Sequence, residues 1–466
     1  MTARSPVPPL VGYAMGAVAA FGLALAFAFV CAPYPIEWAE GRVFDTARLI
    51  LQGEPIYCDI QVLPCADLTY PPLYAALVAA LARVFGLGFG IGRAVSFASL
   101  LWALVSLYRI ARIRCDRWPA LAAPAVFLCF VEACYFAGLL RPDFLSLALV
   151  LCGIEVLLRK TSVSGAVASA LLTLLGLFVK PQAFAAVFAM TVHLAITDRK
   201  RLMAFAAVGA AGGAAIVVAG EILTGHRFLA HHLWYVVSPG HSWAQLGPVL
   251  FYGALPWTVF FAVALYQSLR EGRSDFVSIY FFASLAWALV SSGSTGAAPN
   301  YLFELYVATS IAIAHFLATL RERHLAATLI ALQVFACVFL NPWIGLERYF
   351  SLRELWSARA TMVPDLRAAS EPILVEELGV AGYTGHRLFV NSYVVSHLSG
   401  MHRWDQTPLL ALIRKGGFSR VVLRGAPADR PTRLQRERFT PEMLDAIAAR
   451  YRVAWSDGNW FVYEPR

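Results

Sequence analysis

The sequence predicts an all-α polytopic membrane protein of about 11 or 12 spans, followed by a small soluble α/β domain. Of the 466 residues, 59% are hydrophobic and 14% are charged, whereas soluble domains average about 25% charged residues. Apolar segments of spanning length recur through residues 1–342, and residues 343–466 are polar throughout. We therefore expect a transmembrane module that ends at residue 342 and a soluble domain after it.

Twelve apolar segments, separated by short polar breaks, are the candidate spans. The first is too long for the core of a cleaved signal peptide, so we expect it to be retained. Several of the others are short and could be tilted, re-entrant or fused. The segments lie near residues 10–32, 71–86, 92–108, 118–137, 143–158, 164–179, 181–197, 202–223, 248–268, 276–292, 301–319 and 325–342.

Lysine and arginine are concentrated in alternate breaks, which predicts that those breaks are cytoplasmic. They are Arg109–Arg117, Arg159-Lys160, Arg199–Arg201, Arg270–Arg273 and Arg321–Arg323. The acidic loop, the remaining breaks and the C-terminal domain are then extracytoplasmic. One pair of crossings before Arg109 conflicts with this alternation, so either segment 71–86 is re-entrant or a later pair is miscounted. The net charge of +9 is attributed to these loops, and no nucleic-acid partner is predicted.

The polar C-terminal part alternates short β-like runs with helical runs, which indicates a small α/β domain. Residues 453–455 and 460–463 flank the turn signal Asp457-Gly458-Asn459 and predict a closing hairpin. No glycine-rich phosphate loop is present, so nucleotide binding is not predicted. Strands are expected at Pro372–Glu376, Arg387–Val390 and Arg420–Arg424, and helices at Pro408–Lys415 and Pro441–Arg450.

The acidic loop at residues 33–70 is the most unusual stretch of the chain. It has six carboxylates against two arginines, a formal charge of −4. A helix over residues 38–52 would place Glu37, Glu40 and Arg48 on one side, beside an apolar stripe. Such an amphipathic helix could lie at the membrane surface and offer a carboxylate as general base. Spacing alone favours the alternative, a solvated charged face. The carboxylates are Glu37, Glu40, Asp45, Glu54, Asp59 and Asp67.

Two other polar breaks on the same predicted face carry cations. Arg141 and Asp143 could form a structural ion pair, or Arg141 could bind a phosphate through its guanidinium fork. Lys180, which precedes Pro181-Gln182, could be a snorkelling anchor or a phosphate ligand. Two cations on the face that carries the acidic loop make phosphate binding more competitive with these structural alternatives.

Histidines in the break at residues 224–247 do not have the paired spacing of a metal site, and no metal or cofactor is predicted. They are His226, His231, His232 and His241. Glu304 stands near the start of an apolar run, where ionisable residues are functional candidates. Tyr70 opens another apolar run and, taken alone, fits an interfacial aromatic belt.

The cysteines divide into two groups. Six lie in or beside apolar runs, where cysteine behaves as a small hydrophobe. Cys58 and Cys65 lie in the acidic loop instead, where a disulfide is chemically allowed if the loop is extracytoplasmic. Two unrelated thiols are the alternative.

The order of several motifs resembles the C superfamily of membrane glycosyltransferases. These motifs are W-A-E-G-x-x-x-D-x-A-R-x-I-L-x-G-E-P-I-Y, then Y-P-P-L-Y, G-R-A-V-S, R-P-D-F-L, K-P-Q and N-Y-L-F-E-L. More narrowly, residues 1–342 are similar to bacterial relatives of the protein O-mannosyltransferases and the aminoarabinose transferase. The C-terminal part resembles the soluble tails of some bacterial members.

This resemblance implies a polyprenyl-phosphate sugar donor, an extracytoplasmic acceptor and a location in the bacterial inner membrane. The catalytic carboxylate of the family maps to Glu40. The family often has Asp-Glu here, and this chain has Ala39-Glu40, so Glu37 and Asp45 remain substitutes. The other implied residues bind the donor phosphate or line the cavity: Arg141, Lys180 and Arg48 for the phosphate, and Tyr57, Tyr70, Asp143, Gln182, Asn300 and Glu304 for the cavity.

Two other functions are compatible with the same residues. A transporter or flippase for a lipid-linked saccharide would use the cations without needing a base, and broken helices would favour it. A non-catalytic envelope assembly protein would use its soluble tail to bind a partner. The carboxylates in the acidic loop favour the glycosyltransferase.

Overall fold

The computed structural model describes residues 9–66, 70–234, 242–272, 274–294, 296–319, 324–357 and 362–466, so Asp67 and His241 lie outside the described residues. By packing, the chain forms two compact units. Unit 1 comprises residues 1–31, 93–216 and 238–348, and unit 2 comprises residues 32–92, 217–237 and 349–466. The predicted division at residue 342 concerns placement in the membrane, which packing does not test, so it stays a prediction.

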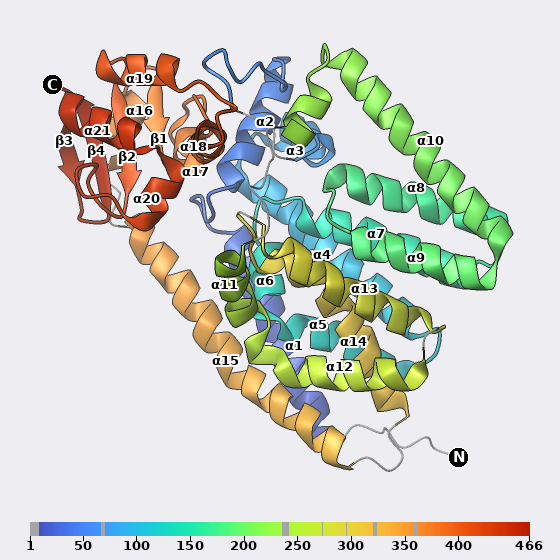
Figure 1. Ribbon diagram of the computed structural model, residues 1–466. Helices are drawn as coiled ribbons and strands as arrows, with labels where there is room; N and C mark the ends of the chain where they lie inside the picture. The colour runs from blue at the N-terminus through green and yellow to red at the C-terminus, as the bar shows by residue number, and fades with distance from the viewer. Residues whose placement is uncertain are drawn as a thin grey trace. The chain divides into compact units, whose positions relative to one another are not determined.

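The regular secondary structure of unit 1, among its described residues, is entirely helical (Figure 1). Three of its helices, α4, α10 and α15, continue into unit 2. Its helices are α1 (Pro9–Val30), α4 (Phe89–Ala111), α5 (Arg117–Cys129), α6 (Val131–Ala137), α7 (Asp143–Arg159), α8 (Val163–Val179), α9 (Phe184–Thr197), α10 (Arg199–Leu223), α11 (Trp243–Gly253), η2 (Leu255–Trp257), α12 (Thr258–Glu271), α13 (Phe276–Ser291), η3 (Pro299–Leu302), α14 (Phe303–Ala318) and α15 (His324–Ser357).

Among the described residues, five helices are long and apolar enough to cross a membrane, or up to seven spans if each of two bent helix pairs counts as one. Four shorter apolar helices, α3 (Leu73–Phe85), α8, α9 and α13, accompany them. The exact number of spans stays a prediction. Helix α15 runs through Pro342 to Ser357, so the helix outlasts the change in composition at residue 342.

Helix α14 is the most buried long helix of unit 1, with apolar side chains on all of its faces, as expected for a core helix. The segment predicted as one span at 118–137 is broken at Phe130, where α5 and α6 meet at 75°. The break leaves the carbonyl of Cys129 without its helical donor. Trp257 Nε1 and Asn341 Nδ2 donate to that carbonyl at 2.9 Å each, which satisfies it away from water.

Unit 2 combines the acidic loop with the C-terminal part of the chain. The loop contributes α2 (Glu40–Gln52), the segment after it contributes α3, and residues 230–234 contribute the π-helix η1. The C-terminal helices are α16 (Met362–Ala368), α17 (Leu378–Thr384), α18 (Ser392–Gly400), α19 (Thr407–Arg414), α20 (Arg433–Arg438) and α21 (Pro441–Arg450).

One four-stranded sheet forms the centre of the C-terminal part, with strand order β1-β2-β4-β3 (Figure 1). Strands β1 (Ile373–Val375) and β2 (Arg420–Arg424) are parallel, and β4 (Trp460–Pro465) runs antiparallel to β2 and to β3 (Tyr451–Ser456). The predicted hairpin is therefore present. The all-α membrane fold with a small C-terminal α/β part, as predicted, is confirmed.

The strand predicted at Arg387–Val390 is wrong. The amide N–H of Arg387 donates to Glu371 Oε1, and that of Leu388 donates to Asp45 Oδ1. Val390 makes a single bridge to Cys65. Side chains and a loop thus take up the hydrogen bonds that a strand partner would have used.

A disulfide joins Cys58 to Cys65, with 5.8 Å between their Cα atoms. The loop that it closes packs into the C-terminal core, because Ile60 and Cys65 are buried there and Trp404 Nε1 donates to the Ile60 carbonyl at 2.7 Å. The disulfide therefore anchors the acidic loop to the C-terminal part within unit 2.

Candidate active site

The residues predicted to carry function fall into two groups, one in each unit. Unit 1 holds the Asp143 cluster, which we define as Arg141, Asp143, Lys180 and Asn300. Unit 2 holds helix α2 with Glu40 as its first residue, preceded by Glu37.

Helices α7 and α8 pack side by side as a hairpin and bring Asp143 close to Lys180, and Asn300 of η3 joins them (Figure 1). Asp143 is the first residue of α7, and Lys180 directly follows α8. Asp143 Oδ1 accepts from Lys180 Nζ and from Asn300 Nδ2 at 2.6 Å each, and its Oδ2 accepts from Arg141 Nε at 3.1 Å. Two cations face one carboxylate, so the cluster carries a formal charge of +1.

A cavity of about 30 Å³ opens beside this cluster, lined also by Gln182, Tyr301 and Glu304. Its size exceeds the roughly 10–15 Å³ that one water needs. Asn300, only 2% exposed, has an Oδ1 without a hydrogen-bond partner among the described residues, and the same holds for the buried Nε2 of Gln182. An orphan acceptor and an orphan donor at one cavity indicate that water or another polar molecule binds there, because such atoms are costly to bury unpaired.

Glu304 has a structural role in addition to lining this cavity. Its carboxylate accepts from the amides of Ala185 (3.2 Å) and Ala186 (2.7 Å), in the first turn of α9. A carboxylate at the N-terminus of a helix satisfies unpaired N–H groups and favours the helix dipole. This interhelical cap could not be anticipated from the spacing of Glu304 within its own helix.

Glu40 lies at the start of α2 and is 0% exposed. Its Oε2 accepts from the backbone amides of Ile36 at 2.6 Å and Glu37 at 3.3 Å. Glu37, which is half-buried, accepts from the Ala39 amide at 3.0 Å. The two carboxylates therefore hold the turn that leads into α2.

Asp45 and Arg48 form a salt bridge of 2.6 Å on α2, and Asp45 also accepts from the Leu388 amide at 3.3 Å. Burial raises the pKa of Asp45, and the nearby Arg48 guanidinium opposes that rise. These contacts tie α2 to the C-terminal part of unit 2. Asp45 and Arg48 thus have a structural explanation, and their predicted catalytic and phosphate-binding roles stay predictions.

The alternative interpretation of α2, a solvated charged face, is wrong, and its placement at the membrane surface stays a prediction. Nine of the thirteen residues of α2 are buried, among them Arg42 and Asp45. Helices α3 and α17 pack against α2, so its charged face is covered by protein. A sequence pattern shows which residues share a face, but it does not show that a distant segment covers that face.

Tyr57 is buried next to the histidines of η1. Its hydroxyl lies 3.1 Å from His232 Nε2, and His231 Nε2 lies 2.7 Å from the carbonyl of Cys58. Burial lowers the pKa of His232 to about 4, which keeps the ring neutral. Tyr70 is half-buried. Within the described part of the chain, no group of three or more metal-ligating side chains could hold a metal ion.

Two buried ionic groups were missed by the sequence analysis. Glu132, in the apolar segment at 118–137, forms a bidentate pair with Arg348 at 2.9 and 3.0 Å. Glu376 and Glu377, at the carboxyl end of β1, bind Arg438, and Glu377 also binds Arg424. A carboxylate inside an apolar run was the signal available for Glu132. The second group follows a strand, where polar residues are common, so no signal marked it.

Comparison with solved structures shows the fold. The apo structure of ArnT from Cupriavidus metallidurans has a TM-score of 0.66 and 14% identity, over 98% of this chain and 98% of that chain. The same protein bound to undecaprenyl phosphate has a TM-score of 0.64 and 14% identity, over 96% and 97% of the two chains.

AglB, an archaeal oligosaccharyltransferase from Archaeoglobus fulgidus in complex with an inhibitory peptide and a dolichol-phosphate, has a TM-score of 0.54 and 10% identity. The match covers 98% of this chain and 74% of AglB. No family model and no curated protein matches the sequence. The chain therefore has the fold of C-superfamily membrane glycosyltransferases, as its motifs predicted, and with its long apolar helices it is a multi-pass membrane protein.

Proposed function

We propose that this protein is a membrane glycosyltransferase that moves a sugar from a polyprenyl-phosphate donor to an extracytoplasmic acceptor. The observation that carries the proposal is the Asp143 cluster, a buried group of formal charge +1 beside a cavity with orphan polar atoms from Asn300 and Gln182. A phosphate is the ligand that the two cations suit best, since the Glu304 carboxylate at the same cavity is bound by the amides of Ala185 and Ala186. The likeness to ArnT, a structure of which holds undecaprenyl phosphate, supports a lipid-borne phosphate.

In this proposal Lys180 and Arg141 stabilise the phosphate that leaves, and Asp143 holds both cations in place. Charge that develops on a leaving phosphate is stabilised best by cations whose positions are already fixed. Asn300 Oδ1 and Gln182 Nε2 would accept from and donate to the polar part of the donor.

Glu40 is proposed as the general base that deprotonates the acceptor, with Glu37 as its substitute. The acceptor oxygen or nitrogen attacks the anomeric carbon, the bond from that carbon to the phosphate oxygen breaks, and the phosphate departs with the electron pair. One displacement inverts the anomeric centre. Asp45 is the weaker candidate because Arg48 and the Leu388 amide already bind it.

The decisive experiment compares wild type with Glu40→Gln in membranes that are given radiolabelled sugar on polyprenyl-phosphate donors. Loss of a general base costs about 10²–10⁴-fold in rate, so we expect transfer to fall by that factor. Glu54→Gln is the matched control, because Glu54 belongs to the same loop and pairs with Arg387 in a half-exposed salt bridge. It should transfer at the wild-type rate.

Lys180→Met tests the phosphate assignment separately. A charge-assisted hydrogen bond contributes about 1.5–3 kcal/mol, so the donor KM should rise about ten- to a hundredfold. Full activity of Glu40→Gln would move the base to Glu37. Absence of transfer by wild type with every donor would reject the glycosyltransferase.

The transporter alternative has one observation in its favour: two helix pairs are broken, α5 with α6 at 75° and α11 with α12 at 43°. Broken helices are common in transporters that bind a substrate near the middle of the membrane. Movement of a lipid-linked sugar across the membrane of sealed vesicles, without transfer to an acceptor, would favour that function.

A further inference from the structure

Helix α2, which begins with Glu40, lies directly against α17 of the C-terminal part of unit 2. The closest approach is at Gly41, the residue after Glu40. A Cβ atom added to Gly41 would lie 2.5 Å from Gly379 Cα and still closer to Gly379 N and the Leu378 carbonyl carbon. All three are backbone atoms, so no side chain can move aside to make room.

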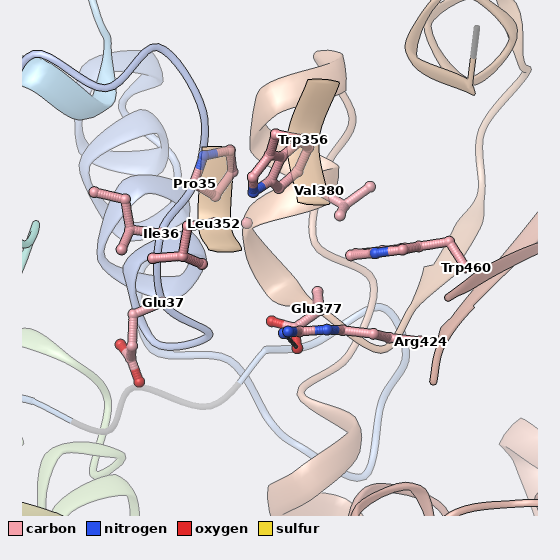
Figure 2. A pocket seen from close by; sticks show the side chains of 10 residues that line it. Pro35, Ile36, Glu37, Leu352, Trp356, Glu377, Val380, Arg424 and Trp460 are labelled. Carbon is pink, nitrogen blue, oxygen red and sulfur yellow. Dashed lines mark hydrogen bonds and ion pairs between the residues drawn. The ribbon is translucent and has the colours of Figure 1, made fainter. Parts of the chain in front are cut away.

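Gly379 of α17 is packed equally tightly against the segment that leads into α2. A Cβ atom added to Gly379 would lie 2.5 Å from Pro35 Cβ, in the segment that leads into α2. The pocket that remains there, lined by Pro35, Glu37 and Trp356 among others, has a volume of only about 10 Å³ (Figure 2). Residues 35–41 are therefore seated against α17 with space for no more than one water.

Two polar contacts fix the same segment. Trp38 Nε1 donates to the Glu376 carbonyl at 3.2 Å, and the Arg438 guanidinium lies 5.9 Å from the Trp38 ring centre. The carbonyl of Glu376 cannot shift easily, because its own carboxylate accepts from the Arg424 amide at 2.7 Å and from Arg438 at 3.2 Å. Figure 2 shows the Arg424 guanidinium against the neighbouring Glu377 carboxylate, which completes this network.

We infer that the C-terminal part of unit 2 positions the proposed base, Glu40. Gly41 is the positioning residue, because α17 contacts α2 there and so fixes the location of Glu40. The inference rests on the proposed function. It gives the C-terminal part of unit 2 a role in catalysis of the transfer reaction. The physical reason is that a general base must lie within hydrogen-bond distance of the acceptor, and an error of about 1 Å can cost about 10²-fold in rate.

The test is Gly41→Ala in the full-length protein, with Gly400→Ala as the matched control. Gly400 lies at the end of a helix of the same unit, and a Cβ atom there would meet nothing within 4 Å. We expect Gly41→Ala to lower kcat about 10²-fold with the donor KM unchanged, because the residues of the Asp143 cluster are intact. Gly400→Ala should keep both constants.

A double-mutant cycle separates positioning from general damage. Glu40→Asp shortens the base by one methylene and should leave measurable activity. If Gly41 acts through Glu40, adding Gly41→Ala to Glu40→Asp lowers the rate far less than it does in the wild type. If the two losses multiply, Gly41 is merely structural and the inference is overturned.

Trp38→Phe provides the same test should Gly41→Ala fail to fold. It removes the indole N–H that donates to Glu376 and keeps an aromatic ring. We expect a several-fold loss of kcat with the same non-additivity toward Glu40→Asp, and a wild-type kcat would overturn the inference. An active wild type, an inactive Glu40→Gln and a fully active, folded Gly41→Ala would reject the inference and leave the proposed function standing.

Discussion

Glu40 and Asp143 are both buried carboxylates at the first residue of a helix, yet their hydrogen bonds differ in kind. Asp143 accepts from Lys180, Arg141 and the Asn300 amide. Glu40 Oε2 accepts from the backbone amides of Ile36 and Glu37. Asp143 balances two cations and is a structural counter-ion, whereas the two backbone amides that donate to Glu40 Oε2 can also donate to the side-chain oxygen of a glutamine. The two should therefore respond very differently to substitution.

The largest expected effect is on folding stability at Asp143. Asp143→Ala leaves Lys180 and Arg141 buried without their carboxylate, and breaking a buried ion pair costs about 3–5 kcal/mol. Glu40→Gln keeps an acceptor oxygen and should cost about 1 kcal/mol or less. Thermal unfolding in detergent measures both. Equal losses of folding stability in the two variants would contradict the proposed difference between Asp143 and Glu40.

The carboxylates of unit 2 extend the comparison to pH. Burial raises the pKa of Glu376 to about 7 from its ordinary 4.5, although Arg438 opposes the rise, whereas Arg438 and Arg424 lower the pKa of Glu377. The folded protein holds the proton of Glu376 more tightly than the unfolded chain does. That contribution to stability is complete below about pH 4.5 and is lost as the pH rises to about 7.

The expected loss over this range is up to about 3 kcal/mol. Thermal unfolding of wild type and Glu376→Gln across pH 4.5–7 measures it, and the variant should lack this part of the pH dependence. Glu377 acts in the opposite direction and only below its ordinary value, so it does not mask the effect. A Glu376→Gln variant with the same pH dependence as the wild type would contradict the raised pKa.

The smallest expected effect is the loss of folding stability in Glu304→Gln. Like Glu40, Glu304 accepts from two backbone amides. Backbone amides of Ala185 and Ala186 hold its carboxylate, so Glu304→Gln should keep one acceptor oxygen and cost about 1 kcal/mol. Glu304→Ala, which leaves both amides unpaired, should cost about 2 kcal/mol more than the glutamine variant. Equal melting temperatures for the two variants would show that this cap does not stabilise α9.

The sequence predicted the parts of this molecule that depend on local patterns. Helix α2, the strands β1 and β2 and the closing hairpin lie where periodicity and turn residues placed them. The fold class followed from composition and from the order of loose motifs. The Cys58–Cys65 disulfide, which the sequence left open, is present.

What the sequence did not reveal depends on partners far along the chain. The burial of α2 requires α17, the cap on α9 requires Glu304 from α14, and the ion pair of Glu132 requires Arg348. Phe130 breaks a helix within an apolar run, and no proline or glycine lies within five residues of the bend. The periodicity of a segment does not show which distant element packs or forms hydrogen bonds with it.

The contact of α2 with α17 has a consequence for biosynthesis. Trp38 and Glu376 are 338 residues apart in the chain, so at about 5–20 residues per second a ribosome needs roughly 20–70 s between them. During that interval α2 exists without the surface that covers it. A nascent or prematurely terminated chain would lack the surface that holds α2. Under the proposed function, sugar transfer could then begin only after the C-terminal part of unit 2 has been made.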